Sequence, residues 1–327
     1  MIDVAFDQRE TSHMSIGMRQ YVAELAARIP RVAPDLQFAR FGSGDNFDWA
    51  EQVAMPFRVA RMRPRIVHIP TPFTPLFIPA PYVMTIHDLI DLNYPDWTKP
   101  KARWYFGVAV RRAARRARCV ITDDSATAND LVRFYGLDLA RIAVVPLGVD
   151  VPDLEPIRRP VPYVMYAGNR RPHKDLKTIL AAWQAVDPRI ELDLVLTGKE
   201  DEALTIPRRE RGNVVFAGEL PHAEVLRWMK GAQALVHAAL REGFGLPLLE
   251  AVRVGTPVIC AQTSVPDVLR EHVLRFAPGD VRALAAAIER ALRGELREQA
   301  QRAGDETAHL TWDHCAALTA DVYRRFL

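Results

Sequence analysis

Short apolar runs alternate with amphipathic helical patterns along almost the whole sequence. Each run is about as long as one strand, and each helical pattern is long enough to cover a sheet. This alternation is typical of parallel sheets, because consecutive parallel strands need a crossover that a helix can supply. The chain is therefore predicted to be an α/β protein. Its expected strands are at 2–6, 65–69, 82–88, 118–124, 142–150, 163–168, 191–198, 213–218 and 234–239, and its expected helices are at 18–29, 103–117, 175–186, 223–232 and 281–294.

A proline-rich segment divides these elements into two sets. Residues 151–162 hold four prolines and no apolar periodicity, so we expect a linker there. The length of 327 residues also suits two domains. We expect Rossmann-like domains at 1–152 and 160–305, with parallel sheets facing across a cleft and ligands bound at the carboxyl ends of their strands. A terminal helix at 306–327 either packs back on the first domain or ends the second.

Composition narrows the classes of function. A net charge of +3 without a nucleic-acid-binding signature does not indicate a nucleic-acid partner. Three cysteines without a C-x-x-C pair argue against a disulfide framework or a zinc site and suit a reducing cytoplasm. The segment 66–86 is nearly uncharged, but its five prolines would break a membrane helix. An acidic start, with Asp3 and Asp7, is not that of a signal peptide. We expect a cytoplasmic protein.

The stretch ALREGFGLPLLEAVRVGTPVIC, residues 239–260, places two carboxylates around a tight turn. Its glycines allow unusual backbone conformations, and Pro247 suits a first helical turn, whose unpaired amides form an anion site. Glu242 precedes this helix entrance and Glu250 lies about one turn inside, which places the carboxylates on the order of 10 Å apart. We predict a diphosphate on the amides, with a sugar near Glu242 and a ribose near Glu250; the alternative is a solvated loop. The turn residues expected to hold this ligand are Gly243, Phe244, Gly245 and Leu246.

Two further segments place charged or polar groups beside predicted strand ends. GNRRPHKDL carries Arg170, Arg171 and Lys174 at a helix start, where fixed cations can stabilise a leaving diphosphate. A solvated basic loop is the alternative. His87, in TIHDL, lies at a strand end where α/β sites form, although a lone histidine is usually structural. Asp88 either holds the loop or orients His87.

These segments resemble the retaining glycosyltransferases of family 4, which have the GT-B fold. REGFGLPLLEAVRVGTPVI is similar to their E-x7-E segment, and the likeness covers nearly the whole chain through YAGNRRPHKDL, LVLTGKED, VVFAGEL, VPLGVD and YVMTIHDLIDLNYPDW. The resemblance implies that Glu250 binds the nucleotide ribose and that Glu242 contacts the donor sugar near the reacting centre. It also implies that Lys174 and one arginine, for which we favour Arg170, meet the diphosphate. His87 would then lie at the donor sugar.

The activity implied by the resemblance is transfer of a hexose, of mannose or glucose type, with retention at the anomeric carbon. The donor would be a nucleotide diphosphate sugar linked to GDP, UDP or dTDP, and the overall likeness favours mannose. The acceptor would be a glycan, a lipid-linked glycan or a small molecule, as in polysaccharide biosynthesis. No cofactor is expected, and the absence of a D-x-D motif predicts metal independence. Two alternatives stay open: another GT-B activity, such as an NDP-sugar epimerase or a phosphorylase, or a weakly active scaffold subunit of a glycan assembly complex.

The segment SHMSIGMRQYVAEL departs from the family pattern. Of the family's glycine loop only Gly17 remains, as an expected donor contact, with Ile16 and Arg19 in place of glycines. Arg19 either approaches the diphosphate or points to solvent. A second departure is Asp124, which stands where relatives usually have a serine.

The expected donor groups divide between the two domains, because His87 and Gly17 belong to the first and the others to the second. We therefore expect the donor to bind mainly to residues 163–305. Closure about a hinge at 151–162 would then bring the first domain onto it and exclude water.

The helix expected at 103–118 is strongly basic and begins with apolar residues. A basic amphipathic helix can lie on an anionic membrane surface, and family members that extend lipid-linked glycans sit there. This predicts peripheral contact with the inner face of a membrane; a core helix with a solvated arginine face is the alternative. The basic residues are Arg103, Arg111, Arg112, Arg115, Arg116 and Arg118, and the apolar ones Trp104, Tyr105, Phe106 and Val108.

Overall fold

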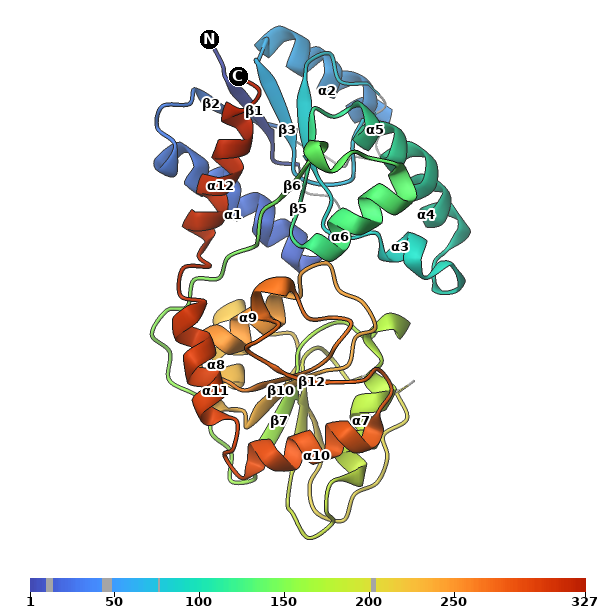
Figure 1. Ribbon diagram of the computed structural model, residues 1–327, viewed down its shortest axis with the longest axis vertical. Coiled ribbons are helices and arrows are strands. Elements are labelled where there is room, and N and C mark those ends of the chain that lie inside the picture. The colour runs from blue at the N-terminus through green and yellow to red at the C-terminus, as the bar shows by residue number, and fades with distance from the viewer. Residues whose placement is uncertain (10–13, 43–48, 76, 201–203) are drawn as a thin grey trace. The chain divides into compact units, whose positions relative to one another are not determined.

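The computed structural model describes residues 1–9, 14–42, 49–75, 77–200 and 204–327. They form two compact units, each with a sheet of six parallel strands and covering helices (Figure 1). Unit 1 comprises Met1–Gly148 and Leu310–Leu327, and unit 2 comprises Val149–His309. The prediction of an α/β protein with two parallel sheets is confirmed. Two segments quoted above extend beyond the described residues: LVLTGKED at residue 201, and the reduced glycine loop at residues 12–13.

The sheet of unit 1 has the strand order β2-β1-β3-β4-β5-β6. Its central strands are buried along their whole length, as expected for parallel strands covered on both faces. The strands are β1 (Val4–Asp7), β2 (Phe38–Phe41), β3 (Ile66–Ile69), β4 (Tyr82–Thr85), β5 (Cys119–Thr122) and β6 (Ile142–Val144). The α-helices are α1 (Ile16–Val32), α2 (Trp49–Met62), α3 (Ile90–Asn93), α4 (Pro100–Trp104), α5 (Arg111–Arg116), α6 (Ser125–Asp130) and α12 (Trp312–Arg324).

The last helix, α12, belongs to unit 1, where it packs along α1 (Figure 1). At its start, Asp313 forms ion pairs with Arg28 and Arg31 of α1. At its other end, the hydroxyl of Tyr323 lies 2.6 Å from Nδ1 of His68 on β3, and both side chains are fully buried. The helix is therefore fixed to both α1 and the sheet.

Gly148, the last residue of the first segment of unit 1, lies directly against the backbone that leads into α12. A Cβ placed on Gly148 would be 2.1 Å from the carbonyl carbon of Thr311 and 2.3 Å from the amide nitrogen of Trp312. Real Cβ atoms do not approach backbone atoms so closely. The close approach of these two segments therefore requires a glycine.

The sheet of unit 2 has the order β12-β11-β10-β7-β8-β9. Strands are added outward from β7 on one side and then from β10 on the other, so the order reverses between β7 and β10. Open α/β sheets bind ligands beyond the carboxyl ends of the strands at this reversal. The strands are β7 (Tyr163–Tyr166), β8 (Asp193–Leu196), β9 (Val214–Phe216), β10 (Ala234–His237), β11 (Val258–Ala261) and β12 (Leu274–Phe276). The α-helices are α7 (Leu176–Ala185), α8 (His222–Gly231), α9 (Leu246–Arg253), α10 (Val281–Leu292) and α11 (Arg297–Glu306).

The core of unit 2 is built on the alternation of side chains along the strands. Val164 and Tyr166 on β7 join a buried cluster with α7 and α10, as residues two apart on one strand should. Trp183 of α7 is among the largest buried side chains of this cluster, and its Nε1 donates to the carbonyl of Leu192 at 2.9 Å. This packing fixes the strand ends that carry the polar residues described below.

The predicted linker, 151–162, contains no helix or strand, yet it is held to unit 2. The amide of Ile157 donates to the carbonyl of Arg227 at 3.0 Å, and Arg159 forms an ion pair with the buried Asp193. The chain instead passes between the units at 148–149 and 309–310. The residues predicted to act as a hinge, 151–162, therefore all belong to unit 2, and closure stays a prediction.

Several other elements differ from the sequence prediction. The helix predicted at 103–118 is a continuous helical run in which α4 and α5 flank a π-helical segment, Tyr105–Val110. Strands β2 and β12 and helices α2, α3, α6 and α11 were not predicted. β2 has only four residues and no fully apolar run, and α2 contains Pro56, which obscures a helical pattern.

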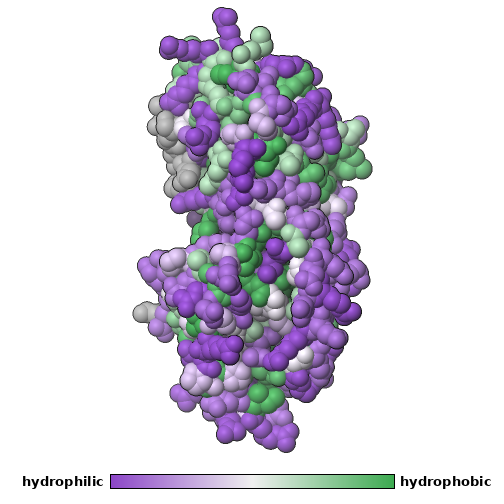
Figure 2. Space-filling view, turned by 90° about the vertical axis from the view of Figure 1, so that its left-hand side faces the viewer, coloured by the Kyte–Doolittle hydropathy of each residue, from purple (hydrophilic) through white to green (hydrophobic). Residues whose placement is uncertain are grey.

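The exposed face seen in Figure 2 is mostly hydrophilic in both units, with smaller hydrophobic areas between the polar residues. Within the described parts of the chain, no helix is both long and apolar enough to cross a bilayer.

Candidate active site

The reversal point of the unit 2 sheet carries a buried cluster of charged and polar side chains. Lys174, which follows β7, forms an ion pair with Glu242, which follows β10. The same Glu242 oxygen, Oε1, lies 2.7 Å from Nε2 of His237 at the end of β10. The Lys174 and Glu242 side chains are 12% and 10% exposed, so the pair is largely screened from water. The two residues predicted to meet the diphosphate and the sugar therefore lie in direct contact.

Charge and burial act in opposite directions on Glu242. Burial alone would raise the pKa of this carboxyl, but the Lys174 ammonium and the hydrogen bond from His237 lower the pKa to about 2. Glu242 is thus a carboxylate at neutral pH. Burial, together with the neighbouring Lys174, lowers the pKa of the adjacent His173 to about 4. The cluster therefore holds the Lys174 cation and the Glu242 anion beside the neutral imidazole of His173.

The turn after Glu242 leads into α9 as the sequence predicts. Gly245 has φ = 78°, a left-handed conformation that favours glycine, and it immediately precedes the first residue of the helix. Pro247 lies in the first helical turn. Across the described residues, the amides of Phe244, Gly245 and Leu246 donate no hydrogen bond to protein groups. They remain available at a helix entrance, where anions are favoured.

Arg170 and Arg171 have different surroundings. Arg170 is half-buried: its guanidinium lies 5.2 Å from the centre of the Phe216 ring and donates to the carbonyl of Thr197 at 3.3 Å. Arg171 is exposed. The guanidinium of Arg170 thus lies at the carboxyl ends of β8 and β9. This favours the sequence assignment of Arg170, whose contact with a diphosphate stays a prediction.

Glu250, on α9, is buried and paired. Its Oε1 lies 2.7 Å from Nε2 of His222, the first residue of α8, and the Glu250 side chain is 7% exposed against 46% for His222. The structure does not bring Glu250 into the Lys174–Glu242 cluster through any direct contact among the described residues. Glu242 and Glu250 therefore have different neighbours, which is consistent with each contacting a different part of a ligand. Their assignment to sugar and ribose stays a prediction.

In unit 1, His87 is buried at the carboxyl end of β4. Its Nδ1 lies 2.6 Å from Oδ2 of Asp123, which follows β5, and the two side chains are 10% and 2% exposed. Asp88, for which the sequence offered either holding the loop or orienting His87, accepts a hydrogen bond at Oδ1 from the amide of Ile90 at the start of α3. Asp88 therefore holds the loop, and Asp123 contacts the imidazole.

The reduced glycine loop is seen in part. Gly17 is the second residue of α1, which is capped by the hydroxyl of Ser15 through the amide of Met18. Gly17 is half-buried, Ile16 is 87% exposed, and Arg19 is exposed. Asp124, the other departure, caps α6 by accepting from the amide of Ala126 at 3.1 Å. An aspartate performs this capping function as well as a serine does.

Three residues of these sites were not identified from sequence: His237, His222 and Asp123. His237 and Asp123 each stand at or just after the carboxyl end of a predicted strand, and that position is the signal that could have found them. His222 begins a helix and carries no comparable signal. Asp123 and His222 were missed because each meets a partner from a different strand or helix, whereas His237 meets Glu242, which follows the same strand.

Two family profiles together match most of the chain. The profile described as Glycosyltransferase Family 4 matches residues 19–153, and that described as Glycosyl transferases group 1 matches residues 154–309. Their junction falls close to the boundary between the two units.

Two curated relatives are identical to this chain at about a quarter of the aligned residues. The O-antigen chain mannosyltransferase B of Escherichia coli is 26% identical over 265 residues, which are 74% of this chain and 70% of the relative. The O-antigen chain mannosyltransferase RfbU of Salmonella typhimurium is 26% identical over 212 residues, 63% of this chain and 59% of the relative. The crystal structure of Anabaena HepE in complex with UDP-glucose superposes with a TM-score of 0.73 at 16% identity, covering 99% of this chain and all of that one.

Proposed function

The chain belongs to glycosyltransferase family 4 and has the GT-B fold, and on this premise we propose that it transfers a hexose with retention at the anomeric carbon. The donor is a nucleotide diphosphate sugar, and mannose is the favoured hexose because the two relatives named above are mannosyltransferases. The acceptor is a hydroxyl of a glycan, a lipid-linked glycan or a small molecule. UDP and dTDP donors stay in the proposal beside GDP, since HepE was crystallised with UDP-glucose.

The observation that carries this proposal is the buried Lys174–Glu242 pair at the reversal point of the unit 2 sheet. A diphosphate that binds at the α9 entrance offers Lys174 a second anion, with amides of the turn and Arg170 as further donors. Fixed cations and amides stabilise the charge that grows on the diphosphate as the sugar leaves. Glu242, held by His237, remains beside the sugar and stabilises its positive charge in the transition state.

The reaction breaks the bond between the anomeric carbon and the diphosphate oxygen. The acceptor hydroxyl attacks from the leaving-group face and forms the new bond to that carbon, while its proton passes to the departing diphosphate. The products are the glycoside and a free nucleotide diphosphate. Glu250 holds the nucleotide ribose in this scheme, and His222 keeps its carboxylate in place. His87 contributes from unit 1 at the donor sugar. No step requires a metal, so we expect full activity in the presence of EDTA.

Product analysis tests the proposal and separates its alternatives. The protein is incubated with GDP-mannose, UDP-glucose and dTDP-glucose in turn, with a mannose-containing oligosaccharide as acceptor, and products are followed by NMR. We expect free nucleotide diphosphate and a glycoside with the anomeric configuration of the donor. An inverted configuration would refute retention. An isomerised donor without free nucleotide would indicate an epimerase, and sugar 1-phosphate formed from glycan and phosphate a phosphorylase.

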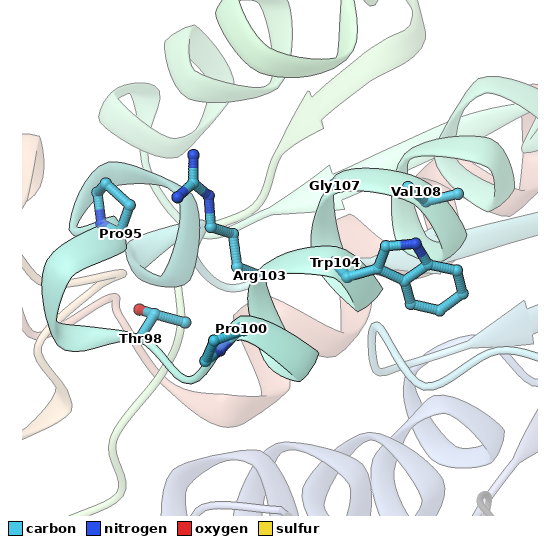
Figure 3. Close-up of a pocket in the computed structure, with 7 residues that line it drawn as sticks. All are labelled: Pro95, Thr98, Pro100, Arg103, Trp104, Gly107 and Val108. Carbon is cyan, nitrogen blue, oxygen red and sulfur yellow. The ribbon is translucent and has the colours of Figure 1, made fainter.

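Peripheral membrane contact is a further part of the proposal, supported by one surface of unit 1. The helical run 100–116 and the turn before it expose Trp97 (46%), Trp104 (63%) and Val108 (50%). Figure 3 shows Arg103 and Trp104 projecting from this run beside a pocket of about 350 Å³. Residues 97–118 contain no acidic side chain and carry the basic residues Lys99, Lys101, Arg103, Arg111, Arg112, Arg115, Arg116 and Arg118. Exposed indoles among cations suit an anionic lipid surface.

Vesicle sedimentation tests this contact. We expect binding to vesicles that contain phosphatidylglycerol and none to pure phosphatidylcholine. Replacing Arg111 and Arg112 by Gln should weaken binding several-fold, whereas the same change at Arg297 and Arg302, which are exposed on α11 of unit 2, should not. An equal loss of vesicle binding in both double variants would mean that binding depends on net charge alone. It would contradict a membrane-binding surface on the helical run 100–116.

A further inference from the structure

We propose that Asp123 is a positioning residue for glycosyl transfer, which holds the His87 imidazole with its proton on Nδ1 and leaves Nε2 for the substrate. This inference rests on the proposed function, because it takes His87 as the group that meets the sugar. Asp123 lies outside the two segments from which the other donor contacts were predicted, ALREGFGLPLLEAVRVGTPVIC and GNRRPHKDL.

The contact between the two residues follows from strand register. β4 and β5 are neighbouring parallel strands in which Thr85 pairs with Ile121. His87 and Asp123 each lie two residues further on, so they leave the sheet at the same level. The imidazole Nδ1 and the carboxylate Oδ2 are 2.6 Å apart. A hydrogen bond at this distance to a carboxylate is a strong one.

Two further contacts hold His87, one at its ring and one at its backbone. Tyr21 of α1 meets the ring edge-on, with ring centres 4.7 Å apart and planes at 88°. The hydroxyl of Thr127 donates to the backbone carbonyl of His87 at 3.2 Å. These contacts leave the ring little freedom to turn, so the proton position is decided by Asp123. A carboxylate accepts only, and Nδ1 must therefore be the donor.

The second ring nitrogen has no such partner. Among the described residues, Nε2 of His87 is buried and makes no hydrogen bond. Leaving a buried polar atom without a hydrogen bond destabilises the fold, so its presence is explained if a ligand supplies the missing partner. With a proton fixed on Nδ1, the neutral form of His87, which predominates above its raised pKa, presents a lone pair at Nε2. That lone pair accepts a hydrogen bond from a sugar hydroxyl.

The charge on the ring depends on all the groups around it. Burial alone would lower the pKa of His87, but the Asp123 carboxylate, with a smaller contribution from Asp88, raises it above the ordinary value. Two other titratable groups face this site: Tyr21, whose pKa burial raises, and His68, whose pKa burial lowers to about 3. Tyr21 and His68 are both neutral near pH 7. Asp123 is thus the main charge that acts on His87.

The first test reads the proton position directly. Nitrogen-15 NMR of the full-length protein distinguishes an imidazole protonated on Nδ1 from one protonated on Nε2, and His87→Gln identifies the signal. We expect the Nδ1–H form in the wild type and a shift toward the Nε2–H form in Asp123→Asn, whose amide can donate to Nδ1. An Nε2–H form in the wild type would overturn the proposal, whatever the protein's activity.

The second test measures turnover against a matched control. Asp123→Asn should lower kcat by about 10-fold or more while leaving the dissociation constant for the nucleotide diphosphate within about 2-fold. Asp124→Asn, one residue away at a helix cap where asparagine is equally suitable, should leave both unchanged. The double variant Asp123→Asn/His87→Ala should be no slower than His87→Ala alone, because Asp123 acts through His87.

These measurements distinguish a failure of the role proposed for His87 from a failure of the role proposed for Asp123. Full activity of His87→Ala would refute the role of His87 in the proposed function, and with it the kinetic role of Asp123. Reduced activity of His87→Ala with wild-type kcat in Asp123→Asn would refute the positioning role alone. If Asp123→Asn does not fold, Asp123→Glu replaces it: a longer carboxylate keeps the Nδ1–H form but displaces the ring, so kcat should fall without a change of tautomer.

Discussion

Lys174 and Glu242, 68 positions apart in the sequence, form a buried ion pair across the reversal point of the unit 2 sheet. In this arrangement the cation expected to meet the donor diphosphate is neutralised by the carboxylate expected to meet the donor sugar. Donor binding then requires the Lys174 ammonium either to leave Glu242 for the diphosphate or to contact both anions at once. The structure thus links diphosphate binding to the freedom of the Glu242 side chain.

Replacing Glu242 should separate binding from turnover. Glu242→Gln keeps the shape of the side chain but removes its charge, so Lys174 is no longer neutralised. We expect the affinity for nucleotide diphosphate to be retained or increased, and kcat to fall by at least about 100-fold, equivalent to roughly 3 kcal/mol of transition-state stabilisation. Glu242→Ala should lose turnover similarly. Calorimetry and turnover on the same preparations check both, and near-normal kcat in either variant would refute the role of Glu242.

Glu250 and His87 should affect different properties. Glu250→Ala removes a predicted ribose contact within unit 2 and should weaken nucleotide binding at least about 10-fold. His87→Ala belongs to unit 1 and should leave nucleotide affinity nearly intact while lowering kcat. His222→Gln, which can still donate to Glu250, is the matched control for the first variant. The division of roles is wrong if His87→Ala abolishes nucleotide binding and Glu250→Ala does not.

The low pKa of Glu242 makes stability dependent on acid. The folded-state pKa of about 2 lies below the ordinary value of 4.5, so the stabilisation is complete above pH 4.5 and is lost as the pH falls toward 2. The difference corresponds to on the order of 3 kcal/mol. Denaturant unfolding of wild type and Glu242→Gln from pH 6 to pH 3 should show a steeper fall for the wild type. Parallel curves would contradict the lowered pKa.

The comparison between variants is needed because other groups also destabilise the fold in acid. Burial lowers the pKa of His173 to about 4 and that of His68 to about 3. Both histidines take up a proton more readily in the unfolded chain, so they destabilise the fold as the pH falls below 6.5. The loss from His68 is common to wild type and Glu242→Gln, so it cancels in the difference. The loss from His173 is larger in Glu242→Gln, because the Glu242 carboxylate raises the pKa of His173.

Gly148 should be intolerant of any side chain. Gly148→Ala would force a Cβ against the backbone of Thr311, and overpacking of this kind costs typically about 1–3 kcal/mol. The matched control is Gly107→Ala, where the nearest heavy atom to a new Cβ lies 4.0 Å away and φ is not left-handed. Thermal unfolding should show a lower Tm for the first variant alone. Equal Tm values would mean that the segment leading into α12 moves without cost.

The sequence predicts well what is local along the chain. Gly245 and Pro247 indicate the entrance of α9 by their own backbone preferences, and alternating apolar runs indicate the buried strands. The paired residues are different. Lys174 meets Glu242 because β10 lies beside β7, and Asp123 meets His87 because of the register of β4 and β5. Strand order and register are set by the packing of whole helices against sheets, which no short stretch encodes.

Unit 1 is discontinuous, since its first segment ends at Gly148 and its last helix follows residue 309. Ribosomes add roughly 5–20 residues per second, so α12 is made on the order of 10–30 s after the first segment. During that interval the buried face of α1 is uncovered and His68 lacks its hydroxyl partner, Tyr323, while the whole of unit 2 emerges as one uninterrupted segment. Unit 2 can therefore complete its folding during synthesis before unit 1 does, and the intermediate exposed to chaperones is a first unit without its last helix.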